Sequence, residues 1–337
     1  MKERCDRVSV LSSEMTDATT TNTASPKSGG GPALTPLQRK TLGLLRRSPD
    51  PVVFDEAFVA GMHADIVATF EAFHERLGDE TIFLSKHRLS SALGCEVQHL
   101  LPDDFAWSPA VAGGQVAHRA IQLGINWRGD PVPDQLVAEA IARLSDDDSS
   151  LGDWIAGLSE ADRADLVGFA VDKVIKFAEC FPPLDKRAAP TTESAVRWPL
   201  EGPIVLSGKV DLAIGRPAGA ESRKVIIDLK TGWVVPRHRE DLRFYALVET
   251  LRTGVPPRKL ASFYLDAGEP VVEDVTERVL LTASRRMLDA VNAEIELKVE
   301  GREPAKRPGV SCKWCRLSSE CDEGQAYLSG DDRNVES

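Results

Sequence analysis

Two apolar segments that each carry one aspartate constrain the fold of this chain more than any other feature. Residues 204–206 (IVL) and 210–214 (VDLAI) are strand-like, and 224–230 (KVIIDLK) is the next strand after a turn-rich connection, GRPAGAESR. If the neighbouring strands pair antiparallel, Asp211 and Asp228 come to one end of a sheet. The sequence therefore predicts a pair of carboxylates held by the backbone of a sheet.

The remaining sequence surrounds these strands with helices. Helical spacing of apolar residues dominates before Pro190. Ser85 or Ser90 is a plausible helix cap, and Gly113-Gly114 is expected to precede a helix that contains His118. After the strands, the pattern predicts a helix over 239–252, a third core strand over 261–265 and a long helix over 275–299.

This order of elements predicts an α/β fold with a central mixed sheet flanked by helices, an inserted helical subdomain and a C-terminal cysteine cluster. The expected parts are a disordered tail, an N-terminal helical part with Cys95 and His118, a helical insertion, a catalytic core, a cysteine segment and a polar tail. Their bounds are 1–34, 35–124, 125–195, 196–300, 301–326 and 327–337.

Net charge and hydropathy limit the class of protein. The formal charge of −11 argues against a surface coated in basic residues for unspecific DNA binding, but the field at a site is local. Residues 302–316 carry five Lys or Arg against one Glu, and 236–243 carry three Arg against two acids. No apolar run is long enough for a bilayer, and residues 1–15 lack the pattern of a secretory signal, so we expect a cytoplasmic protein without membrane contact.

The two aspartates suit a divalent cation. Carboxylate oxygens are hard ligands that Mg²⁺ and Mn²⁺ prefer. Lys230 stands two residues after Asp228 and projects from the same face of the strand, while Leu229 points into the core and offers its backbone carbonyl. Phosphodiester hydrolysis needs bound cations, a positioned water and charge neutralisation. We therefore interpret Asp211 and Asp228 as metal ligands and Lys230 as the residue that positions water, although a D-x-K pair alone is common on surface strands.

Four short motifs in order give this interpretation its context. They are Gly114-x-x-x-His118, Gly208-x-x-Asp211, Asp228-x-Lys230-Thr231-Gly232, and Tyr245 on a later helix. As an ordered set they resemble the PD-(D/E)XK nuclease superfamily, specifically its RecB-like branch. One position departs from that branch, because Asp241 stands where Gln usually precedes the tyrosine by four residues.

The resemblance implies a restriction-endonuclease-like core and further site residues. His118 would be a metal ligand, and the Leu229 carbonyl would join Asp211 and Asp228 around Mg²⁺ or Mn²⁺. Tyr245 would support the Lys230 region or a DNA phosphate. The implied activity is a metal-dependent DNA nuclease, an exonuclease acting on ends or single strands in DNA repair or recombination. Because the chain lacks a G-x4-G-K-[ST] loop, an ATP-driven helicase would be a separate partner.

Cysteines predict a second metal centre. Cys312, Cys315 and Cys321 form a C-x2-C-x5-C run, which suits zinc or iron and needs a fourth ligand. The candidates for that ligand are Cys95, Cys180 and Cys5. Iron–sulfur members of the RecB-like branch, including AddB and CRISPR-associated exonucleases, place one cysteine before the G-x-x-x-H helix. That resemblance implies Cys95 and a 4Fe–4S cluster, whereas ligand chemistry alone equally permits Zn²⁺.

Two alternative functions remain open at this stage. The chain could be a catalytically weak DNA-binding or assembly module that keeps the fold and a structural iron–sulfur or zinc cluster. It could also be a zinc protein with an unrelated hydrolase site.

Overall fold

A computed structural model describes residues 33–102, 105–130, 132–147, 149–235 and 237–330 of the chain. The residues from Leu34 onward form one compact unit by their contacts. The predicted disordered tail lies outside the described residues except for 33–34, and so do Cys5 and residues 331–337 of the predicted polar tail.

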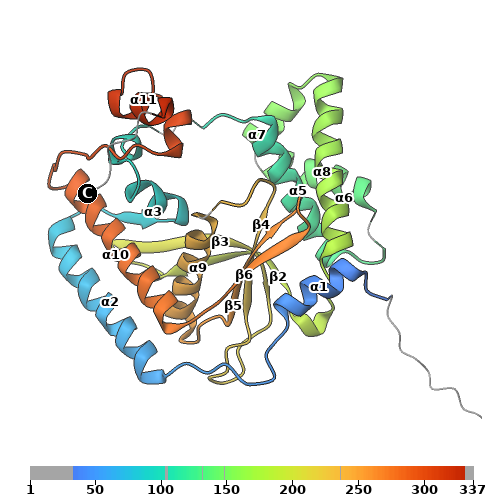
Figure 1. Cartoon of the computed structure of the whole chain (residues 1–337), viewed down its shortest axis with the longest axis horizontal. Coiled ribbons are helices and arrows are strands. Elements are labelled where there is room, and N and C mark those ends of the chain that lie inside the picture. The colour runs from blue at the N-terminus through green and yellow to red at the C-terminus, as the bar shows by residue number, and fades with distance from the viewer. Residues whose placement is uncertain (1–32, 103–104, 131, 148, 236, 331–337) are drawn as a thin grey trace, which may run out of the picture. The chain divides into compact units, whose positions relative to one another are not determined.

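A six-stranded mixed sheet lies at the centre of the molecule (Figure 1). Its path runs β1-β3-β4-β5-β6, and β2 also pairs with β3. The strands are β1 (Ile82–Leu84), β2 (Thr191–Trp198), β3 (Ile204–Ile214), β4 (Val225–Lys230), β5 (Lys259–Tyr264) and β6 (Glu269–Asp274). The β3–β4, β2–β3 and β5–β6 pairs are antiparallel, whereas β1–β3 and β4–β5 are parallel. The predicted mixed sheet flanked by helices is therefore confirmed.

One edge of β3 is shared by two strands, which forks the sheet. β2 pairs with β3 from Leu206 to Ala213 and occupies one edge. On the other edge, β1 pairs only with residues 204–206 and β4 only with residues 212–214. The ends of β1 and β4 thus flank a short stretch of β3 that neither strand covers. We call this stretch, residues 207–211, the fork.

Helices bury both faces of the sheet in two apolar cores. One core joins the sheet to α2 (Glu56–Leu77), α3 (Lys86–Ala92), α9 (Arg237–Thr253) and α10 (Glu277–Lys298). The other joins it to α1 (Pro36–Leu45), α5 (Pro109–Asn126), α6 (Pro133–Asp147), α7 (Ser149–Ala156) and α8 (Glu160–Cys180). Because both faces are covered, β4 is almost continuously apolar, and its one buried charge, on Asp228, stands out.

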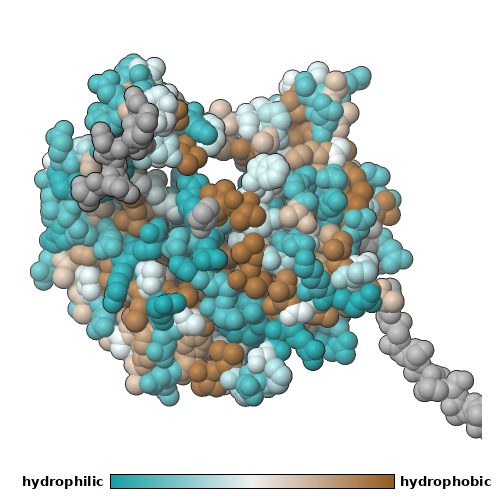
Figure 2. Space-filling model, viewed as in Figure 1, coloured by the Kyte–Doolittle hydropathy of each residue, from teal (hydrophilic) through white to brown (hydrophobic). Residues whose placement is uncertain are grey.

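Short elements complete the fold. They are α4 (Glu96–His99), α11 (Asp322–Ser329), and the 3₁₀ turns η1 (Lys186–Ala188) and η2 (Val310–Trp314). In Figure 1, α11 forms a lobe above α3, and α7 and α8 form a second lobe; Figure 2 shows a notch between the two lobes. Within the described residues, none of the helices combines the length and the apolar character that a membrane span requires.

Several predicted boundaries differ from the structure. Gly113 and Gly114 lie inside α5, which begins at Pro109 behind the Ser108 cap, instead of preceding the helix. The segments 204–206 and 210–214 form one continuous strand, and β2 begins at Thr191, inside the predicted helical insertion 125–195. The part predicted to be helical, 35–124, contains β1, and the end of α11 lies in the predicted polar tail. These short elements carry little periodic signal, whereas the helices expected over 239–252 and 275–299 are confirmed within two residues at each end.

Candidate active site

The two predicted carboxylates meet at the fork. Asp211 and Asp228 each stand one residue beyond the last β3–β4 pair, Leu212 with Ile227. The backbone N–H of Leu229 donates a 2.8 Å hydrogen bond to Oδ2 of Asp211, so the carboxylate takes the place of a ladder partner where the strands separate. The predicted antiparallel pairing of the two strands is confirmed, and it places both acids at the point where the β3–β4 pairing ends.

Asp228 is held by two ammonium groups. Lys230 Nζ lies 2.7 Å from Oδ2 and Lys86 Nζ lies 2.9 Å from Oδ1, while the Asp228 side chain is 4% exposed. Burial alone would raise the pKa of Asp228, but the charges of Lys86 and Lys230 outweigh it and lower this pKa below its usual value. The ion pair with Lys230 confirms that the two side chains project from the same face of β4.

Lys86 was not identified from the sequence. It opens α3 directly after β1, and Ser85 caps that helix by accepting a hydrogen bond from the Arg88 N–H. Burial would lower the pKa of Lys86, but its contact with Asp228 raises it, so the side chain stays cationic. A lysine behind a serine cap looks like an ordinary helix start. Only the pairing of β1 beside β4 on β3 brings it to Asp228.

Tyr245 and Gly208 fill the space beneath these charges. The Tyr245 ring is 3% exposed and lies 5.1 Å from the Lys86 ammonium, a cation–π distance. A Cβ on Gly208 would stand 2.5 Å from Cε1 of Tyr245. The first residue of the G-x-x-D motif is therefore glycine because the tyrosine ring packs against its backbone. Asp241, one turn earlier on α9, is also buried and faces Ser90 Oγ at 3.4 Å.

His118 reaches the site from the opposite layer. Its Nδ1 lies 3.7 Å from Oδ2 of Asp211. The close approach of α5 depends on its glycines, because a Cβ on Gly114 would stand 3.3 Å from Oγ1 of Thr231, and one on Gly113 would stand 2.7 Å from the Phe169 ring. The G-x-x-x-H motif thus packs directly against the Thr231 that follows Lys230.

Glu193 of β2 joins this group and was also missed. Among the described residues, His118, Glu193 and Asp211 form the one set of three His, Cys, Asp or Glu side chains whose ligand atoms all lie within 4.8 Å of one another. Burial raises the pKa of Asp211 above its usual value, although the nearby imidazole opposes this. An imidazole nitrogen and two carboxylate oxygens are a donor set that fits Mg²⁺ or Mn²⁺. Asp228 is not part of this set.

The four cysteines of the predicted cluster line one pocket between α4 and the C-terminal segment. Cys95, Cys312, Cys315 and Cys321 all contribute, together with Lys306 and other neighbours. Backbone N–H groups of Gly309 and Gly324 donate hydrogen bonds to the sulfurs of Cys312 and Cys321 at 3.3 and 3.4 Å. Cys180 is buried elsewhere, against Gly268, so it does not reach the pocket.

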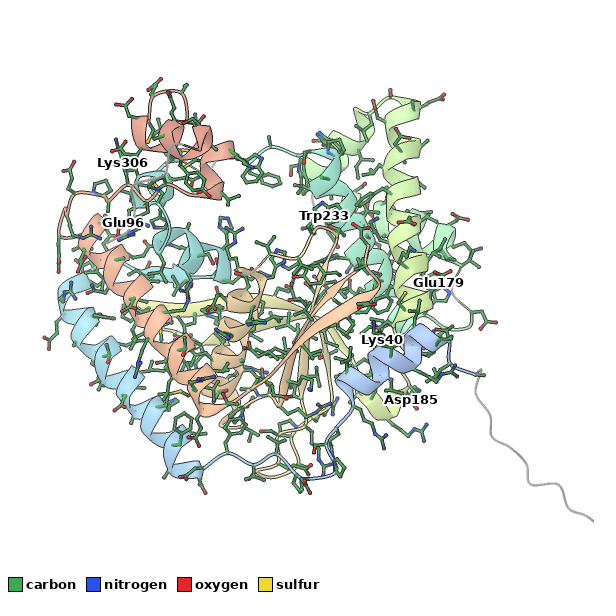
Figure 3. The ribbon with its side chains drawn as sticks, viewed as in Figure 1. Lys40, Glu96, Glu179, Asp185, Trp233 and Lys306 are labelled. Atoms are coloured by element: carbon green, nitrogen blue, oxygen red, sulfur yellow. The ribbon has the colours of Figure 1, made fainter. Side chains whose placement is uncertain are left out.

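A buried carboxylate ties this pocket to the active-site helix. Glu96 follows Cys95 and is 1% exposed; it pairs with Arg302 and accepts a 2.8 Å hydrogen bond from the Ala305 N–H. Hydrogen bonding from Arg302 lowers the pKa of Glu96 to about 2, against the opposing effect of burial. Figure 3 shows Glu96 and Lys306 between the α11 lobe and α3. The cysteine segment is therefore anchored to the α3–α4 region that carries Lys86.

An exposed indole borders the site. Trp233 follows Lys230 by three residues and is 90% exposed, and Val234 and Val235 beside it are also exposed. Figure 2 shows hydrophobic surface along the notch between the two lobes, and Figure 3 places Trp233 there. Arg237 and Arg239 follow, and neither forms an ion pair with any residue in the described ranges. Packing within the fold gives no reason for an indole at this position.

The chain was compared with protein families, curated proteins and solved structures. A sequence profile of the PD-(D/E)XK nuclease superfamily matches residues 84–322. No curated protein matches the chain. Among solved structures, the protein SSO0001 is 17% identical, with 61% of this chain and 94% of that chain covered and a TM-score of 0.26. An exonuclease candidate from Eubacterium rectale is 14% identical, with 70% and 95% covered and a TM-score of 0.30.

Proposed function

The chain belongs to the PD-(D/E)XK nuclease superfamily, and on that premise we propose that it is a metal-dependent deoxyribonuclease. The observation that carries the proposal is the meeting of His118, Asp211, Asp228 and Lys230 at the fork of the sheet. Three separate parts of the chain supply these residues, and no structural need of the fold explains two carboxylates, an imidazole and an ammonium in one buried place.

The roles follow from the contacts. His118 and Asp211 would hold the divalent cation, with Asp228 and the Leu229 carbonyl as the further ligands expected from the sequence. When bound, the cation would polarise the scissile phosphate and neutralise part of its charge. Lys230, fixed by Asp228 at 2.7 Å, orients the attacking water and faces the developing negative charge.

Lys86 supplies a second ammonium to the same place. Its side chain is 26% exposed, so one face of the charge is open to a ligand while the other contacts Asp228 and the Tyr245 ring. We assign it the role of binding a non-bridging oxygen of the substrate phosphate. Tyr245 supports the site by packing its ring against the Lys86 ammonium.

The substrate best matched by the surroundings is a single strand or a strand end. Base stacking on an aromatic side chain contributes about 1–3 kcal/mol per base and needs an exposed ring, which Trp233 offers beside Lys230. Arg237 and Arg239 add local positive charge in a chain whose net charge is −11. Exonuclease action in repair or recombination, with a separate helicase opening the duplex, fits such a site.

The cysteine pocket is proposed to hold a 4Fe–4S cluster with a structural role. The four cysteines that line the pocket can supply the thiolates that such a cluster requires, and the resemblance to iron–sulfur members of the RecB-like branch favours it over zinc. Brown colour with bound iron and sulfide after anaerobic purification supports this assignment, whereas stoichiometric zinc without iron contradicts it.

The activity is tested by incubating anaerobically purified protein with end-labelled single- and double-stranded DNA, with and without Mn²⁺. Cleavage that needs Mn²⁺ and is lost in both Asp228→Ala and Lys230→Ala supports a nuclease that uses this site. DNA binding without cleavage by the wild-type chain would instead support a DNA-binding or assembly module.

A further inference from the structure

We propose that Glu193 is an additional side-chain ligand of the divalent cation held by His118 and Asp211. The inference rests on the proposed metal-dependent site and deepens it. None of the four sequence motifs includes this glutamate, which lies on β2, a strand that the sequence did not reveal.

Three side chains from separate elements converge at this place. His118 comes from α5, Glu193 from β2 and Asp211 from β3, and one ligand atom of each lies within 4.8 Å of the other two. Two carboxylates and a neutral imidazole balance the charge of one divalent cation. Without a cation, two carboxylates facing each other at a partly buried position repel.

The β2–β3 ladder is interrupted at Glu193 and Asp211. Thr192 pairs with Leu212 and Ser194 with Val210, so Glu193 and Asp211 stand opposite each other, yet they are not paired. Glu193 has a φ of 50°, a left-handed conformation that is rare for a glutamate and rarer inside a strand. Such strain persists where the surroundings enforce it, and it is common at functional sites.

The face of β3 changes at the same residue. Val210 packs in the core beneath α9 and α10, whereas Leu212 packs in the core beneath α5 and α8. Residues two apart on a regular strand share a face, so β3 turns over at Asp211. The irregularity on both strands lets Glu193 and Asp211 direct their carboxylates to the same side as His118.

Asp228 faces two ammonium groups. Its Oδ1 accepts a hydrogen bond from Lys86, and its Oδ2 forms an ion pair with Lys230. Asp228 is therefore less available to a cation beside Asp211 than Glu193, whose carboxylate faces one ammonium among the described residues. The competing partner of Glu193 is Lys209, whose side chain is 61% exposed and can turn into solvent.

Mn²⁺ binding tests the inference without relying on catalysis. Wild-type protein, purified anaerobically and passed over a chelating resin, is titrated with MnCl₂ while the signal of free Mn²⁺ is followed by electron paramagnetic resonance. Loss even of an outer-shell partner typically weakens metal affinity by about 10- to 100-fold, so Glu193→Gln is expected to weaken Mn²⁺ binding by about tenfold or more. Unchanged affinity in Glu193→Gln overturns the inference.

Lys209→Gln is the matched control. It removes the same Glu193–Lys209 ion pair but keeps the carboxylate, so Mn²⁺ affinity should be unchanged or higher than in the wild type. Equal loss of Mn²⁺ affinity in both variants would show that Glu193 matters only through its ion pair, which also overturns the inference. If Glu193→Gln does not fold, Glu193→Asp retains the charge with a shorter reach, and wild-type affinity in that variant would count against a ligand role.

The two proposals fail separately. Mn²⁺ binding that depends on Glu193, in a protein that cleaves no DNA, would leave the cation site standing and remove the nuclease. Mn²⁺-dependent cleavage by the wild type, with unchanged Mn²⁺ affinity in Glu193→Gln, would support the nuclease and exclude Glu193 as a ligand.

Discussion

Replacement of Gly208 by alanine tests how the fork of the sheet is packed. The added Cβ would stand 2.5 Å from Cε1 of Tyr245, whereas carbon atoms in contact lie about 3.5–4.0 Å apart, so the ring or the strand must shift by about 1 Å. Tyr245 is 3% exposed and packs in the apolar core, so a shift of its ring disturbs buried neighbours. Overpacking of this kind costs about 1–3 kcal/mol of folding free energy.

The assay is equilibrium chemical denaturation followed by tryptophan fluorescence. Gly232→Ala is the control, because a Cβ there meets nothing within 4 Å although the residue lies beside the same site. Gly208→Ala should be destabilised by about 1–3 kcal/mol relative to that control. The cost should shrink in a Tyr245→Leu background, because the aromatic edge that causes the clash is gone.

Gly208→Ala should also impair catalysis, since a displaced ring no longer supports the Lys86 ammonium, 5.1 Å away. Equal stability of Gly208→Ala and Gly232→Ala, or a cost that persists without the tyrosine ring, would refute this account of the G-x-x-D glycine.

Three further predictions concern charge, substrate and the cysteine segment. Burial raises the pKa of Asp211, so the stability that its neutral form contributes is present at acid pH and is lost as pH rises through that pKa. Without a cation, the Asp211→Asn variant should therefore have a higher melting temperature than the wild type at neutral pH. The difference in melting temperature should shrink toward acid pH. Trp233→Ala should weaken single-stranded DNA binding, measured by fluorescence anisotropy, by about 1–3 kcal/mol, and Trp233→Phe should restore most of it. The pKa of Glu96 is lowered to about 2, so its ion pair with Arg302 in the cysteine segment is lost only as pH falls toward that value. Glu96→Gln removes this ion pair at neutral pH, so metal loss from the cysteine pocket to a chelator should be faster in that variant than in the wild type.

Much of the fold could be predicted because its longer elements have a clear pattern of apolar residues. The helices α9 and α10 follow from apolar spacing over many residues, and strands β4 and β5 follow from short continuous apolar runs. The short strand β1 has three residues, too few for any period to emerge. Its pairing with β3 is a long-range event, and Lys86 enters the site only through that pairing.

The candidate site was predictable where neighbours in sequence are also neighbours in space. Asp228 and Lys230 project together because they are two residues apart on a strand, and their ion pair was anticipated for that reason. Glu193 could not be found in this way. Its strand, β2, was not among the predicted strands and begins inside the segment assigned to the helical insertion, 125–195, and its backbone departs from regular strand geometry. A glutamate within TTESAV gives no local sign of the aspartate opposite it.

The cysteine pocket is an intermediate case. The C-x2-C-x5-C spacing indicates a metal centre by itself, but the fourth residue was assigned by resemblance. The structure brings Cys95 to the same pocket as Cys312, Cys315 and Cys321, and excludes Cys180 from it. Distance along the chain could not decide between these cysteines, because α5 to α8 and strands β2 to β6 lie between Cys95 and the other three.

The claim that this site cleaves DNA with a divalent cation is tested most directly by single-turnover cleavage of a 5′-labelled single-stranded oligonucleotide. The wild type, Lys230→Met and Lys209→Met are compared, each with Mn²⁺ and with chelator. We expect cleavage to require Mn²⁺ and to be about 100-fold slower or more in Lys230→Met, because Lys230 stabilises negative charge in the transition state. We expect Lys209→Met to cleave at the wild-type rate, because the Lys209 side chain is exposed. Cleavage that persists in chelator, or that Lys230→Met leaves at the wild-type rate, would contradict this claim.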